Sequence, residues 1–164
     1  MPKLLIGERT VLVENVTIKR KAMKFELQDF LPYQLNQAAE QVSRDFQSVY
    51  KREYGMLRTE WRVLFHLGHY GKMTARSICD RGNLHKTKVS RAVAALEEKR
   101  FLTRNTSASD RRHEFLELTS NGRAVFERLS VQAQEYQKEL ISRFSKQEYE
   151  ALSSALKILS RTTD

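Results

Sequence analysis

The segment over residues 74–119 constrains the fold of this chain more than any other. Thr74 can cap a short helix that ends at Gly82, and a second helix is predicted over residues 85–100 after a tight connection. Two short apolar runs then flank a polar tip over residues 101–119, which predicts a β-hairpin. The segment therefore predicts two helices joined by a turn and followed by a hairpin.

Helical periodicity continues on both sides of this segment. Apolar residues recur at steps of three and four over residues 28–53 and again over residues 120–164. The predicted caps of these and the intervening helices are Thr59, Thr119 and a capping box formed by Ser145 and Glu148. The apolar stripes of the outer helices exceed what a small lobe can bury. We therefore expect a second copy of the chain to cover them.

A helix-turn-helix followed by a hairpin is a winged helix. We predict a mainly α fold with a small β-hairpin wing, in which N- and C-terminal dimerisation helices accompany a winged helix-turn-helix lobe. The expected parts are an N-terminal extension at 1–27, a helical dimerisation region at 28–56 and 120–164, and the lobe at 57–119. Within the extension, VLVENVTI (11–18) is rich in β-branched residues and could pair as a short strand.

Basic residues gather in the winged-helix segment. The whole chain carries a formal net charge of +9 and has a pI of about 9.8. From Lys72 to Arg112, eleven Lys and Arg stand against four acids, so this stretch holds +7 of the surplus. Charge alone also fits a solvated basic face. Its concentration in a small helical segment favours a polyanionic partner, double-stranded DNA in particular.

Composition argues against several other classes of protein. No apolar run approaches the ~20 residues of a membrane span, and the first residues lack the features of a signal peptide. Cys79 is the only cysteine, so we expect no intrachain disulfide and a cytoplasmic, reducing location. No Gly-rich phosphate loop, paired-carboxylate motif or Ser/His/Asp arrangement is legible. We therefore expect a protein that is not an enzyme and that needs no cofactor.

The predicted helix over residues 85–100 has two contrasting faces. At 100° per residue, one face gathers Val89, Ala92, Val93 and Leu96, which would pack on the preceding helices. The opposite face, with its flanks, carries Lys86, Thr87, Lys88, Ser90 and Arg91. Short side chains let a helix approach the floor of the major groove, hydroxyl groups bond to bases or phosphates, and an arginine can bind guanine. This helix is therefore the candidate recognition helix, although an ordinary amphipathic surface helix has a similar pattern.

Two runs of sequence carry a resemblance to a known family. LHKTKVSRAVAALEEKRFLTR (84–104), followed by SDRRHEFLELTSNGR (109–123), resembles the MarR family of winged-helix transcriptional regulators, and the similarity covers about residues 28–161. The family's wing carries a DRR motif, then an alternating strand, then LTxxG. Two positions depart from its pattern. Arg100 stands where a glycine is usual, and His85 stands where a serine cap is common.

The resemblance implies a homodimer whose two lobes straddle a near-palindromic operator. It implies DNA contacts from Lys86, Thr87, Lys88, Ser90 and Arg91 of the recognition helix. In the wing, Asp110 would hold the hairpin through an arginine, and either Arg111 or Arg112 would enter the minor groove. The residues leave open which of the two arginines reaches the DNA.

Regulators of this kind often bind small aromatic acids or phenols. The resemblance places such an effector among Tyr33, Arg62, His66 and Phe126, where cationic and aromatic side chains suit an aromatic acid. Arg62 and His66 could equally brace the lobe against the dimerisation helices. His66 and His69 lie three residues apart, but no further ligand follows at a suitable spacing, so we predict no metal site. Cys79 falls on the inward side of its helix, and we expect a buried, unreactive thiol.

Two classes of function remain. The first is a sequence-specific repressor that an effector releases from its operator. The alternative is an architectural DNA-binding protein with little sequence preference, which the charge of +9 and the basic run at 19–24 would also serve. An RNA-binding module is disfavoured because no aromatic stacking platform is visible.

Overall fold

The computed structural model describes residues 25–106 and 114–160. The chain divides into two units, residues 1–38 and 39–164. The predicted strand at 11–18, the basic run at 19–24 and the wing residues Asp110, Arg111 and Arg112 lie outside the described residues.

The described part of the first unit is a short helical turn followed by the start of a long helix. The 3₁₀ turn η1 spans Leu27–Asp29, and α1 spans Leu31–Tyr54, continuing into the second unit. Pro32 occupies the first turn of α1, where its missing N–H costs little. The rings of Phe25 and Phe30 meet edge to face at 5.6 Å, yet both side chains remain largely exposed.

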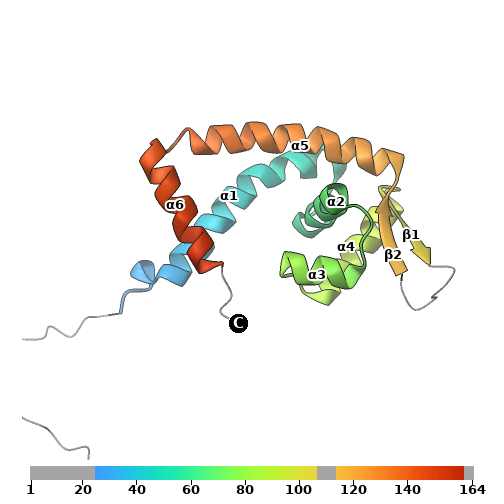
Figure 1. The fold of residues 1–164 in the computed structure, drawn as a ribbon, viewed down its shortest axis with the longest axis horizontal. Coiled ribbons are helices and arrows are strands. Elements are labelled where there is room, and N and C mark those ends of the chain that lie inside the picture. The colour runs from blue at the N-terminus through green and yellow to red at the C-terminus, as the bar shows by residue number, and fades with distance from the viewer. Residues whose placement is uncertain (1–24, 107–113, 161–164) are drawn as a thin grey trace, which may run out of the picture. The chain divides into compact units, whose positions relative to one another are not determined.

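The second unit contains the predicted winged helix (Figure 1). Its elements are α2 (Arg58–Tyr70), α3 (Ala75–Gly82), α4 (Lys86–Glu98), β1 (Leu102–Thr106) and β2 (Glu114–Leu118). The two strands pair antiparallel, with Leu102 opposite Leu118 and Thr106 opposite Glu114. Met73 adds a bridge to Leu116, which anchors the loop before α3 to the hairpin. The predicted mainly α fold with a β-hairpin wing is confirmed.

Buried side chains from all of these elements form one core. The face of α4 predicted to be internal is buried along its whole length, and Val89 and Leu96 have no exposed surface. Leu64 of α2 and Ile78 of α3 are equally buried, and Leu116 contributes from the hairpin. Each such side chain contributes about 1.5–3 kcal/mol on burial, so this core holds α4 in place.

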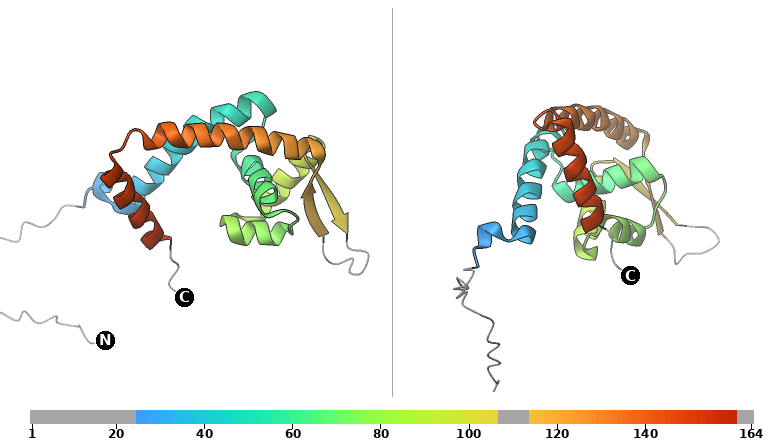
Figure 2. Two further views of the ribbon diagram at one scale, coloured as in Figure 1. Left: turned by 45° about the horizontal axis from the view of Figure 1, so that its top comes forward. Right: turned by 60° about the vertical axis from the view of Figure 1, so that its left-hand side comes forward.

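Two further helices complete the second unit. The helix α5 (Ser120–Ile141) leaves the hairpin, and α6 (Lys146–Leu159) turns away from it after a sharp bend (Figure 2). Their predicted caps are confirmed. The Thr119 hydroxyl accepts from the Gly122 N–H at 3.0 Å, and Ser145 and Glu148 form the reciprocal capping box.

The predicted cap of α2 is wrong. The helix begins at Arg58 after Leu57, no side chain caps it, and Thr59 lies inside its first turn. The Arg58 guanidinium binds Glu40 at 2.6 Å and the Ser43 hydroxyl at 2.8 Å, both on α1. These contacts with a neighbouring helix fix the start of α2 ahead of the position that local capping chemistry favours.

The second residue after α4 adopts a left-handed conformation despite having a side chain. Arg100 has φ of 58°, at the position where the family pattern has glycine. The turn is closed by the Phe101 N–H, which donates to the Leu96 carbonyl at 2.9 Å. The Thr119 hydroxyl also donates to the Arg100 carbonyl at 2.7 Å. These bonds hold a conformation that costs a non-glycine residue roughly 1–2 kcal/mol.

Within the described residues, no helix combines the length and the apolar character needed to cross a membrane.

Candidate nucleic-acid interface and adjoining cleft

The outer face of α4 presents a continuous set of basic and hydroxyl side chains. All five residues predicted to contact DNA are exposed: Lys86, Thr87, Lys88, Ser90 and Arg91. They lie opposite the buried face of the same helix, so the core sets their direction. No acidic residue occurs on α4 before Glu97. The arrangement suits the approach of a polyanion to the first turns of the helix.

The turn that leads into α4 is defined by the end of α3. Asn83 adopts the left-handed conformation with φ of 47°, and the Leu84 N–H donates to the Cys79 carbonyl at 3.0 Å. His85 then forms the N-cap of α4, where its Nδ1 accepts from the Thr87 N–H at 3.4 Å. The histidine thus replaces the usual serine with a longer, weaker capping bond.

Arg104 joins the hairpin to the end of the recognition helix. Its Nε donates to a Glu97 carboxylate oxygen at 2.8 Å, and its Nη1 donates to Glu114 at 3.0 Å. The hydrogen bond to Glu97 is the largest of the effects that raise the pKa of Arg104. No sequence pattern indicates this role of Arg104, because its two carboxylate partners come from separate elements.

A cavity adjoins the residues predicted to contact DNA. It has a volume of about 480 Å³ and lies against α3, α4 and the hairpin. Lys86, Ser90 and Arg104 line it together with Cys79. Cys79 is half-buried, so the expectation of a fully buried thiol was too strict.

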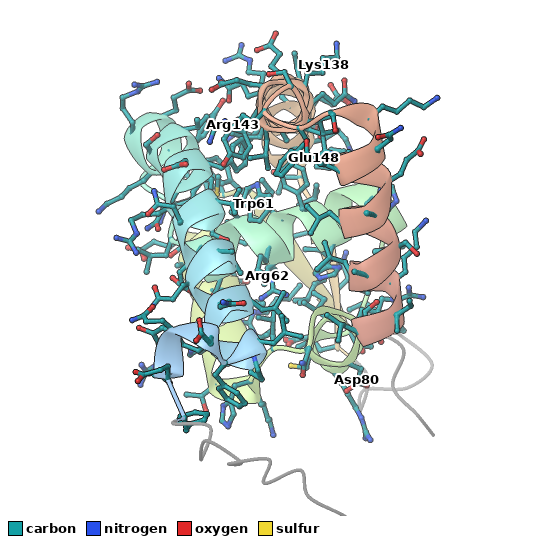
Figure 3. All side chains as sticks on the ribbon, turned by 90° about the vertical axis from the view of Figure 1, so that its left-hand side faces the viewer. Trp61, Arg62, Asp80, Lys138, Arg143 and Glu148 are labelled. Carbon is teal, nitrogen blue, oxygen red and sulfur yellow. The ribbon has the colours of Figure 1, made fainter. Side chains whose placement is uncertain are left out.

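A larger cleft lies between α2 and α5 and has a volume of about 820 Å³. It is lined by Trp61, Arg62, Phe65, His66, His69, Tyr70, Phe126, Ser130, Ala133, Gln134, Gln137 and Lys138. We call this the α2–α5 cleft. Trp61 and Arg62 extend from α2, and Lys138 stands on α5 (Figure 3). Aromatic side chains form much of its wall, with Phe65 and Phe126 meeting edge to face at 5.2 Å.

The cleft is electropositive. Arg62, His66 and Lys138 all line it, and no acidic residue does. Burial lowers the pKa of His66 below its usual value, and the nearby charges of Arg62 and Arg81 and the imidazole of His69 lower it further. Burial, with a smaller effect of Arg58, also lowers the pKa of Arg62. An anion entering the cleft would relieve this accumulation of positive charge.

Three of the four residues predicted to bind an effector line this cleft together: Arg62, His66 and Phe126. Tyr33 is half-buried on the part of α1 that belongs to the first unit, so its assignment stays a prediction. Sequence reasoning missed Trp61, Tyr70 and Lys138. Trp61 and Phe65 lie four residues apart, which places them on one face of α2. No sequence signal shows which face of α5 lies opposite that face. Among the described residues, no cluster of three or more His, Cys, Asp or Glu could hold a metal ion.

Comparisons with known proteins agree with this geometry. A family model described as MarR family matches residues 54–113, which span the helix-turn-helix and much of the hairpin. The HTH-type transcriptional regulator YwoH of Bacillus subtilis (strain 168) is 27% identical over 123 residues, covering 75% of this chain and 88% of YwoH.

Solved structures extend the similarity beyond the helix-turn-helix and the hairpin. A MarR/EmrR family transcriptional regulator from Acinetobacter sp. ADP1 is 30% identical, with a TM-score of 0.74, covering 82% of this chain and 95% of that one. Bordetella bronchiseptica BpsR shares the fold, with a TM-score of 0.75 and 18% identity over 85% of this chain and 99% of its own. The chain therefore belongs to the MarR family of DNA-binding transcriptional regulators.

Proposed function

We propose that this chain is a cytoplasmic, homodimeric repressor that binds a near-palindromic operator and is released from it by a small planar organic acid. The observation that carries the proposal is the division of α4 into a buried apolar face and an exposed face of five basic and hydroxyl side chains. The core thereby presents those side chains in one direction, as a helix in the major groove requires.

Sequence readout is assigned to the exposed face of α4. Arg91 can bind a guanine edge through two hydrogen bonds, and Ser90 is short enough to let the helix approach the bases. Lys86 and Lys88 would contact phosphates, which fixes position without reading sequence. Arg111 or Arg112 of the wing is proposed to enter the minor groove, with Asp110 holding the hairpin.

A second copy of the chain is proposed to cover the outer helices. No residue of α6 is buried within one chain, and Leu152, Leu156 and Leu159 are 40%, 47% and 55% exposed. An apolar stripe of this kind on a soluble regulator indicates an interface. In such a dimer two recognition helices would enter successive major grooves about 10 bp apart, which accounts for an inverted repeat.

The α2–α5 cleft is the proposed effector site. Its positive side chains and aromatic walls suit a planar ring that carries a carboxylate. The structure of the similarly folded BpsR concerns regulation of its DNA binding by 6-hydroxynicotinic acid, a ligand of this chemical class. The effector would act by population shift, favouring lobe positions that do not match the operator.

The test compares specific with random DNA. Duplexes are selected from a random pool on the purified protein, and the affinities of selected and random duplexes are measured by fluorescence anisotropy at fixed salt. We expect the selected sequences to converge on an inverted repeat bound about 10³-fold or more tightly than random duplex. Equal affinity for both duplexes would contradict the repressor function. It would support the alternative of an architectural DNA-binding protein, which the net charge of +9 would also serve.

Two variants refine the test. Arg91→Ala is expected to weaken operator binding about tenfold or more and to relax the preference at one base pair of each half-site. Arg128→Ala is the matched control, because it removes the same charge from an exposed position on α5. Equal losses in both variants would mean that Arg91 contributes only its charge.

A further inference from the structure

The C-terminal end of α3 depends on a residue outside the helix. A helix leaves its last four carbonyls without intrahelical donors. Here the Leu84 N–H donates to the Cys79 carbonyl at 3.0 Å, and the Asn83 N–H donates to the Asp80 carbonyl at the long distance of 3.5 Å. The carbonyl of Gly82, the last residue of α3, accepts its hydrogen bond from a side chain outside the helix.

That partner is Arg62 of α2. Its Nη2 donates to the Gly82 carbonyl at 2.5 Å in a partly buried setting. A cation at a helix C-terminus is also favoured by the helix dipole. In Figure 3, Arg62 lies on the side of α2 that faces α3, where Asp80 is labelled. Arg62 therefore acts as a tertiary cap for α3, directly before the turn into α4.

Arg62 also belongs to the wall of the α2–α5 cleft, and two other wall residues contact the same end of α3. Tyr70 stacks against the Arg81 guanidinium at 4.5 Å. The His66 ring packs so closely that a Cβ on Gly82 would lie 2.9 Å from its Nε2. The cleft and the end of α3 thus share Arg62, His66 and Tyr70.

A carboxylate in the cleft would compete for Arg62. A hydrogen bond between a guanidinium and a carboxylate, charged on both sides, is roughly twice as strong as a neutral one, and it can be bidentate. The Gly82 carbonyl offers Arg62 one neutral acceptor. A planar acid that draws the Arg62 guanidinium towards the cleft would therefore weaken its bond to the Gly82 carbonyl. Three residues further on, His85 begins the recognition helix.

We propose that Arg62 is the positioning residue that couples the cleft to the recognition helix. In the free protein its guanidinium holds the end of α3 and keeps α4 ready to bind DNA. An aromatic acid in the cleft takes the guanidinium, loosens the turn at Asn83 and Leu84, and lowers the affinity for the operator. This inference rests on the proposed function, since it specifies how the effector site acts.

The first experiment needs no ligand. Arg62→Gln is expected to bind the selected operator about tenfold more weakly than the wild type, because the Gly82 carbonyl loses its charged donor. Arg128→Gln is the matched control, because it removes an equal charge from an exposed position on α5 that lies outside the cleft lining. It should keep wild-type operator affinity. Wild-type affinity in Arg62→Gln, with a normal melting temperature, would overturn the proposal and leave the regulator function intact.

The second experiment measures the turn itself by hydrogen exchange of residues 79–88, with no DNA present. Faster exchange at Asn83 and Leu84 is expected in Arg62→Gln, and in the wild type with benzoate, salicylate or 6-hydroxynicotinate, but not with neutral benzamide. Binding is followed by the fluorescence of Trp61, the only tryptophan of the chain and a wall residue of the cleft. The wild-type measurement keeps the proposal testable if Arg62→Gln does not fold.

The outcomes distinguish a failure of the coupling through Arg62 from a failure of the repressor function. An acid that quenches Trp61 without changing exchange at the turn would overturn the coupling, and failure of all three acids to bind would overturn the competition for Arg62. A wild type that binds selected and random duplex equally would instead overturn the repressor function, while the exchange data would still decide the role of Arg62.

Discussion

The lobe formed by α2, α3, α4 and the hairpin differs from α6 in how its apolar residues are used. In the lobe, an apolar stripe on each helix meets another stripe of the same chain, and residues such as Leu64 and Ile78 have no exposed surface. The helix α6 has a comparable stripe, yet none of its residues is buried. The lobe therefore carries its own core, whereas the described residues of the chain leave the apolar stripe of α6 uncovered.

Among the substitutions that test this contrast, Leu64→Ala has the largest expected effect. Removing a fully buried leucine should lower the free energy of unfolding by about 2–5 kcal/mol, through lost burial and a residual cavity. Urea unfolding measures it. The comparator is Leu156→Ala on α6. If α6 forms the proposed dimer contact, its effect should be small at high protein concentration and grow as dilution dissociates the dimer. A large, concentration-independent loss in Leu156→Ala would show that α6 already has a core partner within the chain.

Gly122→Ala tests the junction between the lobe and α5. A Cβ at this position would lie 1.8 Å from the Phe101 carbonyl oxygen, so the backbone must move. We expect a loss of about 1–3 kcal/mol in the free energy of unfolding. Asn121→Ala is the control at an exposed neighbouring position. Similar unfolding midpoints for the two variants would mean that the start of α5 is not fixed against the lobe.

Two helix caps give a smaller, paired comparison. Thr119→Ala removes the bond to the Gly122 N–H at the edge of the lobe, and Ser145→Ala breaks the capping box of α6. Each should cost about 1 kcal/mol in the free energy of unfolding. Only Ser145→Ala should also weaken self-association, which sedimentation velocity can measure. Weaker association in Thr119→Ala alone would place the dimer contact nearer the lobe.

The smallest expected effect is a pH dependence confined to the lobe. Burial, Arg62, Arg81 and His69 lower the pKa of His66 below 6.5, so the unfolded chain binds a proton more readily than the folded one. The contribution of His66 to stability is therefore present above pH 6.5 and is lost as the pH falls below it. Urea unfolding at pH 7.5 and 5.5 should show this decline, and His66→Phe should reduce it. An unchanged decline in His66→Phe would assign the effect to other groups.

Local chemistry made much of the lobe predictable. The period of α4 identified Val89 and Leu96 as internal, and Thr74 and Thr119 were identified as caps because their hydroxyls serve nearby backbone donors. Thr59 failed as a cap because contacts of Arg58 with α1 fix the start of α2. Capping preferences amount to about 1 kcal/mol, so such contacts can override them.

The two candidate sites differ in how far local sequence patterns predict them. The exposed face of α4 follows from helical period alone, because its opposite face must be buried. The α2–α5 cleft was predicted only through a family resemblance, and its remaining wall residues, such as Lys138, could not be found from the sequence. Residues that lie far apart in the chain converge there, and no local pattern records which helix faces lie opposite each other.

Sequence patterns alone predicted the order of the elements, the inward face of each helix and the concentration of positive charge near α4. These depend on helical period, capping and side-chain type, which act over a few residues. The three-dimensional packing was needed to show that Arg62 caps a neighbouring helix while lining a cleft, and that Arg100 adopts a left-handed conformation. Both depend on packing between distant segments, where several contacts together outweigh the preference of any single residue.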